Sequence, residues 1–102
     1  NLLSVQSQID ETISLENISS SKIYPNPVFD NSNISFDLNK SELVNISVYN
    51  LNGSLIKNLH NNVMMNKGHI DIPFNSSKLS MGTYLVVIES GNQKDVVKFV
   101  KY

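Results

Sequence analysis

The sequence predicts an all-β protein, an immunoglobulin-like antiparallel β-sandwich of two sheets with about seven strands. From Lys22 onward, apolar residues recur at every second position, and helical spacing is not sustained anywhere. Turn signals separate these runs about every 8–12 residues, the spacing typical of sandwiches. A length of 102 residues, of which 40% are hydrophobic and 17% charged, fits one domain with its own core.

The first four predicted strands lie before residue 60. A short strand is expected at residues 22–24. Alternation of apolar and polar residues then predicts strands over 34–38 and 44–51, each with one buried face. Asn52-Gly53 separates the latter from the run 55–59, and this pair suits the positive φ angles of a type I′ turn. We therefore expect a tight hairpin here.

Three further strands complete the predicted sandwich. Alternation over 70–74 predicts a strand in which Pro73, having no N–H, indicates an edge position or a strand end. The run 83–89 is apolar on both faces and rich in β-branched residues, which favours an interior strand. After a turn at Gly91-Asn92, residues 96–102 are expected to pair with the preceding strand as a hairpin.

The N-terminal stretch differs in composition from the rest of the chain. Residues 1–21 carry Asp10, Glu11 and Glu16, have no lysine and are rich in serine. We interpret them as a linker or the tail of a preceding domain, with the folded domain at 22–102. Because the chain starts without Met or a basic-then-apolar leader, we expect it to be a piece of a longer protein.

Composition argues against several kinds of partner. Eight lysines, no arginine and nine acidic residues give a net charge of -1, which argues against nucleic-acid binding. The longest apolar run, 84–88, is far shorter than the roughly 18–20 residues that cross a bilayer, so no membrane insertion is expected. Without cysteine, the chain has no disulfide, no thiolate zinc site and no cysteine nucleophile.

No catalytic or cofactor site can be assembled from the sequence. There is no Gly-x-Ser-x-Gly turn, and His60 and His69 lack clustered ligands, so both are interpreted as surface residues. The segment 30–33 resembles the start of a calcium loop, but Ser35 and Ser41 stand where Gly and Glu are needed. A polar turn is expected there. We predict no enzyme activity, no metal and no cofactor.

Three short motifs occur in a fixed order: Tyr24-Pro25-Asn26-Pro27, Gly82-Thr83-Tyr84 and the ending Lys98-Phe99-Val100-Lys101-Tyr102. The prolines of the first motif fix φ and hold the entry to the domain extended. In the second motif, glycine permits a positive φ, and tyrosine can bury its ring and tether its hydroxyl to a loop, as tyrosine corners do. Direct recognition of this tyrosine by a partner is the alternative.

The two lysines of the last motif lie three positions apart on a strand, and hence on opposite faces. At least one of them is expected to be exposed near the C-terminus. An exposed face of this kind is either simply solvated or a docking edge, and the pattern leaves both open.

Together with the segment 48–53, Val48-Tyr49-Asn50-Leu51-Asn52-Gly53, these motifs make residues 22–102 resemble the type A C-terminal sorting domain of the Bacteroidetes type IX secretion system. The resemblance implies a non-catalytic domain fused behind a secreted cargo, which it directs through the outer-membrane translocon after the periplasm. It also implies that a surface sortase removes the domain by cutting within or near residues 15–22. The cargo would then be secreted or held at the cell surface.

The resemblance also implies partner recognition by the motif residues. These are Pro25, Asn26, Pro27, Gly82, Tyr84, Lys98, Val100, Lys101 and Tyr102. We expect a partner to read the last two strands by pairing with an open strand edge. Exposed edges leave open whether isolated domains dimerise by edge-strand pairing.

The alternative function is a non-catalytic carbohydrate-binding or spacer sandwich attached to a secreted polysaccharide-degrading enzyme. It predicts an exposed aromatic cluster or a polar cleft on one sheet face. The absence of tryptophan counts against it.

Overall fold

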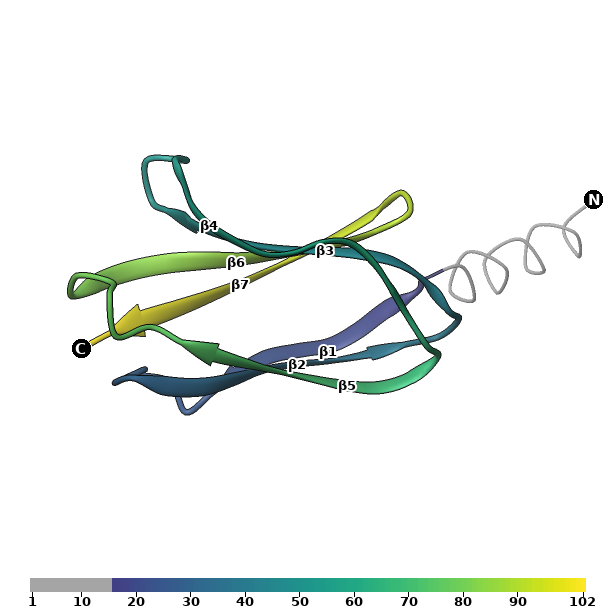
Figure 1. The fold of residues 1–102 in the computed structure, drawn as a ribbon, viewed down its shortest axis with the longest axis horizontal. Coiled ribbons are helices and arrows are strands. Elements are labelled where there is room, and N and C mark those ends of the chain that lie inside the picture. Colours follow the sequence, from purple (N-terminus) through teal and green to yellow (C-terminus); the bar gives the residue numbers. More distant parts are fainter. Residues whose placement is uncertain (1–15) are drawn as a thin grey trace, which may run out of the picture.

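The computed structural model describes residues 16–102, which form two antiparallel sheets packed face to face (Figure 1). The strands are β1 (Ile18–Tyr24), β2 (Asn31–Leu38), β3 (Glu42–Asn50), β4 (Leu55–Met65), β5 (Gly68–Asn75), β6 (Gly82–Ser90) and β7 (Gln93–Lys101). One sheet has the order β1-β2-β5 and the other β4-β3-β6-β7. The predicted seven-stranded β-sandwich is confirmed. Over residues 16–102, no helix is long and apolar enough to span a membrane.

The core fills the space between the two sheets. Its members alternate with outward residues along each strand, because successive side chains of a strand point to opposite faces. The fully buried apolar side chains are Ile18, Val28, Ile34, Phe36, Val44, Ile46, Val48, Val86, Ile88 and Phe99. The ring of Phe99 stacks on Tyr84 at 5.4 Å and meets Phe74 edge-on at 5.8 Å. This aromatic cluster joins β5 of one sheet to β6 and β7 of the other.

The predicted places of the last strands within their sheets are also confirmed. The doubly apolar strand β6 lies between β3 and β7. β5, which contains Pro73, is an edge strand, as the missing N–H of proline indicates. β7 pairs with β6 as a hairpin in which Ser90 lies opposite Gln93.

The β3–β4 hairpin is confirmed, but the predicted turn type is wrong. A type I′ turn needs positive φ at both central residues, whereas Gly53 has a φ of 86° and Asn52 is not among the residues with positive φ. The N–H of Gly53 donates to the Asn50 carbonyl, and the N–H of Asn50 donates to the Ser54 carbonyl, both at 3.0 Å. This is a three-residue loop that ends in a left-handed glycine. The Asn50 side-chain oxygen stabilises it by accepting the N–H groups of Asn52 and Ser54.

β1 starts at Ile18, earlier than the strand predicted at 22–24, and so includes part of the predicted linker. Ile18 lies opposite Leu38, and its side chain is 1% exposed. The alternation is interrupted because the register shifts between Ser19 and Lys22, where a β-bulge inserts one extra residue opposite β2. Residues 1–15 of the predicted linker lie outside the described residues.

Candidate recognition surface at the end of the last strand

The loop between β1 and β2 lies along the outer edge of β7, and Asn26 makes the first contacts. Its Oδ1 accepts the N–H of Val100 at 3.2 Å, and its Nδ2 donates to the Lys98 carbonyl at 3.3 Å. The Asn26 amide therefore occupies the edge much as the peptide group of a neighbouring strand would. Pro25 and Pro27, on either side, lie inside the domain rather than at its entry as predicted, because β1 precedes them.

Val28 continues this closure of the β7 edge. Its N–H donates to the Val100 carbonyl at 2.7 Å, and its carbonyl accepts the N–H of Tyr102 at 2.8 Å. Val28 thereby forms a parallel bridge with Lys101, and its side chain is fully buried. The expectation of an open edge is wrong for the C-terminal half of β7, because its outward-facing backbone groups are already paired.

β6 brings the second motif beside the third. Gly82 lies opposite Lys101 and has a positive φ of 153°, which favours glycine. Tyr84 lies opposite Phe99, is only 8% exposed and donates its hydroxyl to the Ser80 carbonyl at 2.7 Å. The tyrosine-corner interpretation of Tyr84 is confirmed, and its ring belongs to the core.

The two lysines of the ending lie on opposite faces, as predicted. Lys98 is exposed, whereas Lys101 is 5% exposed. The Nζ of Lys101 lies 3.2 Å from Oδ1 of Asp30, whose side chain is 68% exposed. Asp30, considered above as the start of a calcium loop, is the counter-ion of this lysine. Within residues 16–102, no group of three or more side chains could hold a metal ion.

An exposed aromatic pair lies at the same end of β7. The rings of Phe29 and Tyr102 meet edge-on at 5.8 Å, and the two residues are 60% and 57% exposed. Met81, which is 78% exposed, directly precedes Gly82 and so lies beside the end of β7. Sequence reasoning missed Phe29 and Met81. The detectable signal for Phe29 is the adjacent apolar pair Val28-Phe29, of which only one side chain can face the core.

All nine residues predicted for recognition lie around the C-terminal end of β7. Pro25, Asn26, Pro27, Gly82, Lys98 and Tyr102 are exposed, Val100 is half-buried, and Tyr84 and Lys101 are buried. We define the C-terminal patch as Asn26, Phe29, Met81, Lys98 and Tyr102. Large apolar side chains exposed together often mark interaction sites. Recognition of this patch by a partner stays a prediction.

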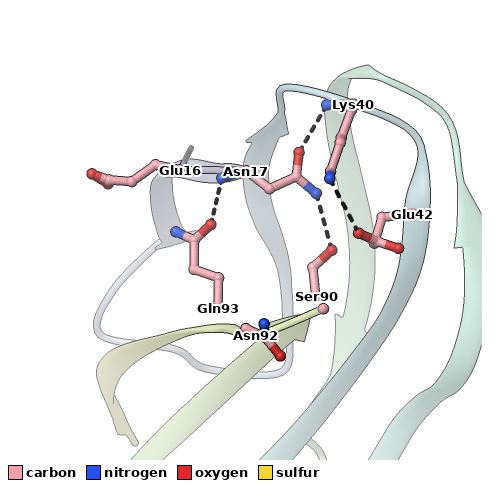
Figure 2. Close-up of a pocket in the computed structure, with 8 residues that line it drawn as sticks. Glu16, Asn17, Lys40, Glu42, Ser90, Asn92 and Gln93 are labelled. Carbon is pink, nitrogen blue, oxygen red and sulfur yellow. Dashed lines mark hydrogen bonds and ion pairs between the residues drawn. The ribbon is translucent and has the colours of Figure 1, made fainter. Parts of the chain in front are cut away.

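A second set of contacts, the N-terminal clasp, lies at the other end of β7 (Figure 2). It consists of Asn17, Ser90 and Gln93. The Gln93 Oε1 accepts the N–H groups of Asn17 and Ile18 at 2.5 and 2.7 Å, and its Nε2 donates to the Ile18 carbonyl at 2.8 Å. Asn17 donates from Nδ2 to Ser90 Oγ at 3.1 Å and accepts the N–H of Lys40 at 2.8 Å. The clasp fixes the start of β1 to the β6–β7 hairpin.

His69 lies on the outer face of the three-stranded sheet between two carboxylates. Its Nδ1 is 2.8 Å from Asp37 Oδ1, and its Nε2 is 3.4 Å from Asp71 Oδ2 and 3.2 Å from Ser35 Oγ. This Ser-His-Asp set is not a hydrolase site. Ser35 is 1% exposed and lies in a central strand paired on both sides, which leaves no free backbone donors for an oxyanion. His69 is exposed, as predicted, and His60 is half-buried.

The domain is expected to lose stability as the pH rises through the pKa of His69. The hydrogen bond to Asp37 raises this pKa above 6.5, desolvation opposes the shift, and the charge of Asp71 adds to it. Because the folded-state pKa is the higher one, the stabilisation is complete below the unfolded pKa and is lost above the folded pKa. Urea denaturation should show His69→Gln losing more stability at about pH 5.5 than at about pH 8.5. His60→Gln is the control, and a pH-independent loss for His69→Gln would contradict the prediction.

The fold and these contacts define a small β-sandwich module whose motif residues converge on the end of its last strand. The family model for the secretion system C-terminal sorting domain matches residues 22–102, and the chain belongs to this family. No curated protein matches the chain. Membership confirms the resemblance to type IX sorting domains and implies export of an attached cargo through the outer membrane.

Proposed function

We propose that the type IX machinery reads the C-terminal patch as the address of a cargo fused before the domain. The observation that supports this proposal is that motif residues distant in the sequence lie together in the structure. Asn26, Gly82 and Lys98 come from three distant parts of the chain, yet all lie at one end of β7. The exposed pair of Phe29 and Tyr102 adds apolar surface that the core does not use.

In this proposal, exposed and buried motif residues have different roles. Asn26, Phe29 and Tyr102 touch the partner with their side chains. Tyr84 and Lys101 do not contact the partner, because both side chains are buried. Their role is to hold the residues of the patch in position. The partner reads a composite surface of loop and strand, since the backbone groups at the end of β7 are already paired.

We also propose that the surface sortase cuts before Asn17, at the start of the predicted window. Proteases need several extended residues in their cleft, and a segment held in a sheet must first unfold. Asn17 and Ile18 are buried and held by the clasp, whereas Glu16 is exposed. The folded domain then begins at Asn17. The mass of the C-terminal peptide of the exported cargo locates the cut.

Export of a fluorescent reporter protein tests whether the C-terminal patch is required for secretion. The reporter carries a signal peptide and the 102-residue chain at its C-terminus, in a host with this secretion system. Phe29→Ala with Tyr102→Ala should lower the exported fraction about tenfold or more, because both rings are lost from the centre of the contact. Purified domains should keep the circular dichroism of the original chain.

Leu43→Ala is the matched control. Leu43 is 46% exposed and belongs to no motif, and it lies beside Val44, which pairs with Ser90 at the end of β6 away from the C-terminal patch. Its reporter should reach the medium or the cell surface, trimmed of the domain. Normal export of the folded Phe29→Ala, Tyr102→Ala variant would overturn the proposal.

A further inference from the structure

A hollow lies at one end of the three-stranded sheet, where β1 and β5 end and β2 begins, outside the C-terminal patch. Outward-facing residues form most of its lining, and Ser32 and the core residue Phe74 complete it. Across the strands, Tyr24 lies opposite Asn33, and Asn33 lies opposite Pro73. The next row pairs Asn31 with Asn75. The hollow has a volume of about 550 Å³, within the usual range for small-molecule sites.

Tyr24 forms one wall of this hollow as a fixed aromatic surface. The residue is 40% exposed. Its hydroxyl donates to Asp71 Oδ1 at 3.0 Å, and the Nζ of Lys22 lies 5.4 Å from the ring centre. These two contacts hold the ring in one orientation, so that little side-chain entropy is lost when a ligand packs on it.

The polar side chains that line the hollow are three asparagine amides and the hydroxyl groups of Ser32 and Tyr24, and no charged residue lines it. The Nδ2 of Asn75 donates to Oδ1 of Asn31 at 2.9 Å, which orients both side chains. The side chain of Asn33 is half-buried and makes no hydrogen bond within residues 16–102. The buried hydroxyl of Ser32, which also lines the hollow, has no partner there either. An amide offers a donor and an acceptor side by side, as a ligand with many hydroxyl groups requires.

We propose that this hollow binds a neutral saccharide. An apolar face of one sugar ring packs on Tyr24, and hydroxyl groups exchange hydrogen bonds with the free amide groups of Asn33 and Asn31. The lining is uncharged, and the Lys22 and Asp71 groups beside Tyr24 have opposite charges, so the hollow has no net charge that would favour a nucleotide or an acidic sugar. The site is distinct from the C-terminal patch, and this proposal does not depend on sorting.

An NMR titration of the ¹⁵N-labelled chain tests the proposal with three neutral hexasaccharides, of β-1,4-linked glucose, xylose and mannose. At least one should shift the side-chain amide signals of Asn31, Asn33 and Asn75 at concentrations up to about 10 mM, the range of a single-platform site. Tyr24→Ala should weaken binding about tenfold or more, because the ring surface is lost.

Two further variants separate binding from folding. Tyr24→Phe keeps the ring but loses the hydrogen bond to Asp71, so its affinity should stay within about threefold of the original. Tyr102→Ala removes another exposed tyrosine and should leave binding unchanged. The proposal is overturned if none of the three sugars shifts these amides, or if Tyr24→Ala binds as well as the original chain. A proline decapeptide that shifts them when sugars do not would assign the hollow to extended peptides instead.

Discussion

A chain ending at Val96 is expected to be unfolded. It lacks Phe99, which is fully buried and packs against Tyr84 and Phe74. It also lacks half of the partner strand of β6 and the bridge to Val28. Truncation of one buried phenylalanine alone costs about 3–5 kcal/mol, out of a total stability of about 5–15 kcal/mol for a typical domain. Circular dichroism and NMR spectra of the purified chain check this.

Removal of Tyr102 alone is the matched control. This residue is 57% exposed, so a chain ending at Lys101 should lose about 1 kcal/mol or less in urea denaturation. A natively folded chain ending at Val96 would contradict the prediction. If the truncated chain is unfolded, loss of export on deleting 97–102 cannot be assigned to recognition, and substitutions within the C-terminal patch become the decisive test.

The ion pair between Lys101 and Asp30 is expected to respond unequally to loss of either partner. Lys101→Met should change the free energy of unfolding by no more than about 1 kcal/mol, because methionine fills a similar volume and Asp30 stays solvated. Asp30→Ala should destabilise the domain by about 1–3 kcal/mol, because it leaves a buried ammonium without its carboxylate. This value is below that of a fully buried pair, because water screens the exposed Asp30.

The double variant gives a second, independent check. Asp30→Ala combined with Lys101→Met should be nearly as stable as Lys101→Met alone, because no buried charge is left uncompensated. Urea denaturation of the four chains measures the coupling. Equal losses in the two single variants, or additive losses in the double variant, would contradict this account of the pair.

Most strands could be predicted because each depends on a local pattern. The alternation along β2, β3 and β5 follows from the pleat of a strand with one buried face. Pro73 indicates an edge strand because proline has no N–H to donate to a neighbouring strand. The start of β1 could not be predicted, because a bulge at Ser19–Lys22 interrupts the alternation. The turn type was wrong because the side chain of Asn50, outside the Asn-Gly pair, binds the loop.

The candidate site was predicted as a set of residues but not as an arrangement. The order of the motifs identified Asn26, Tyr84 and Lys101. The sequence pattern of β7 alone, however, does not show that the β1–β2 loop packs along its edge. Asn26 and Val100 are separated by 74 positions, and Lys101 and Asp30 by 71. Such contacts depend on how the two sheets stack. For this reason the sequence predicted an open edge where the structure has a closed one.

The closure of β7 has a consequence for the behaviour of many copies of the chain together. Backbone groups in the C-terminal half of this strand are paired with Asn26 and Val28, and side-chain contacts at Gln93 and Asp95 hold β1 beside the other half. Unpaired edges invite strand addition and aggregation, most of all in crowded compartments. A surface that combines Asn26 with the end of β7 therefore offers specific side-chain contacts, while this part of the edge provides no template for strand addition.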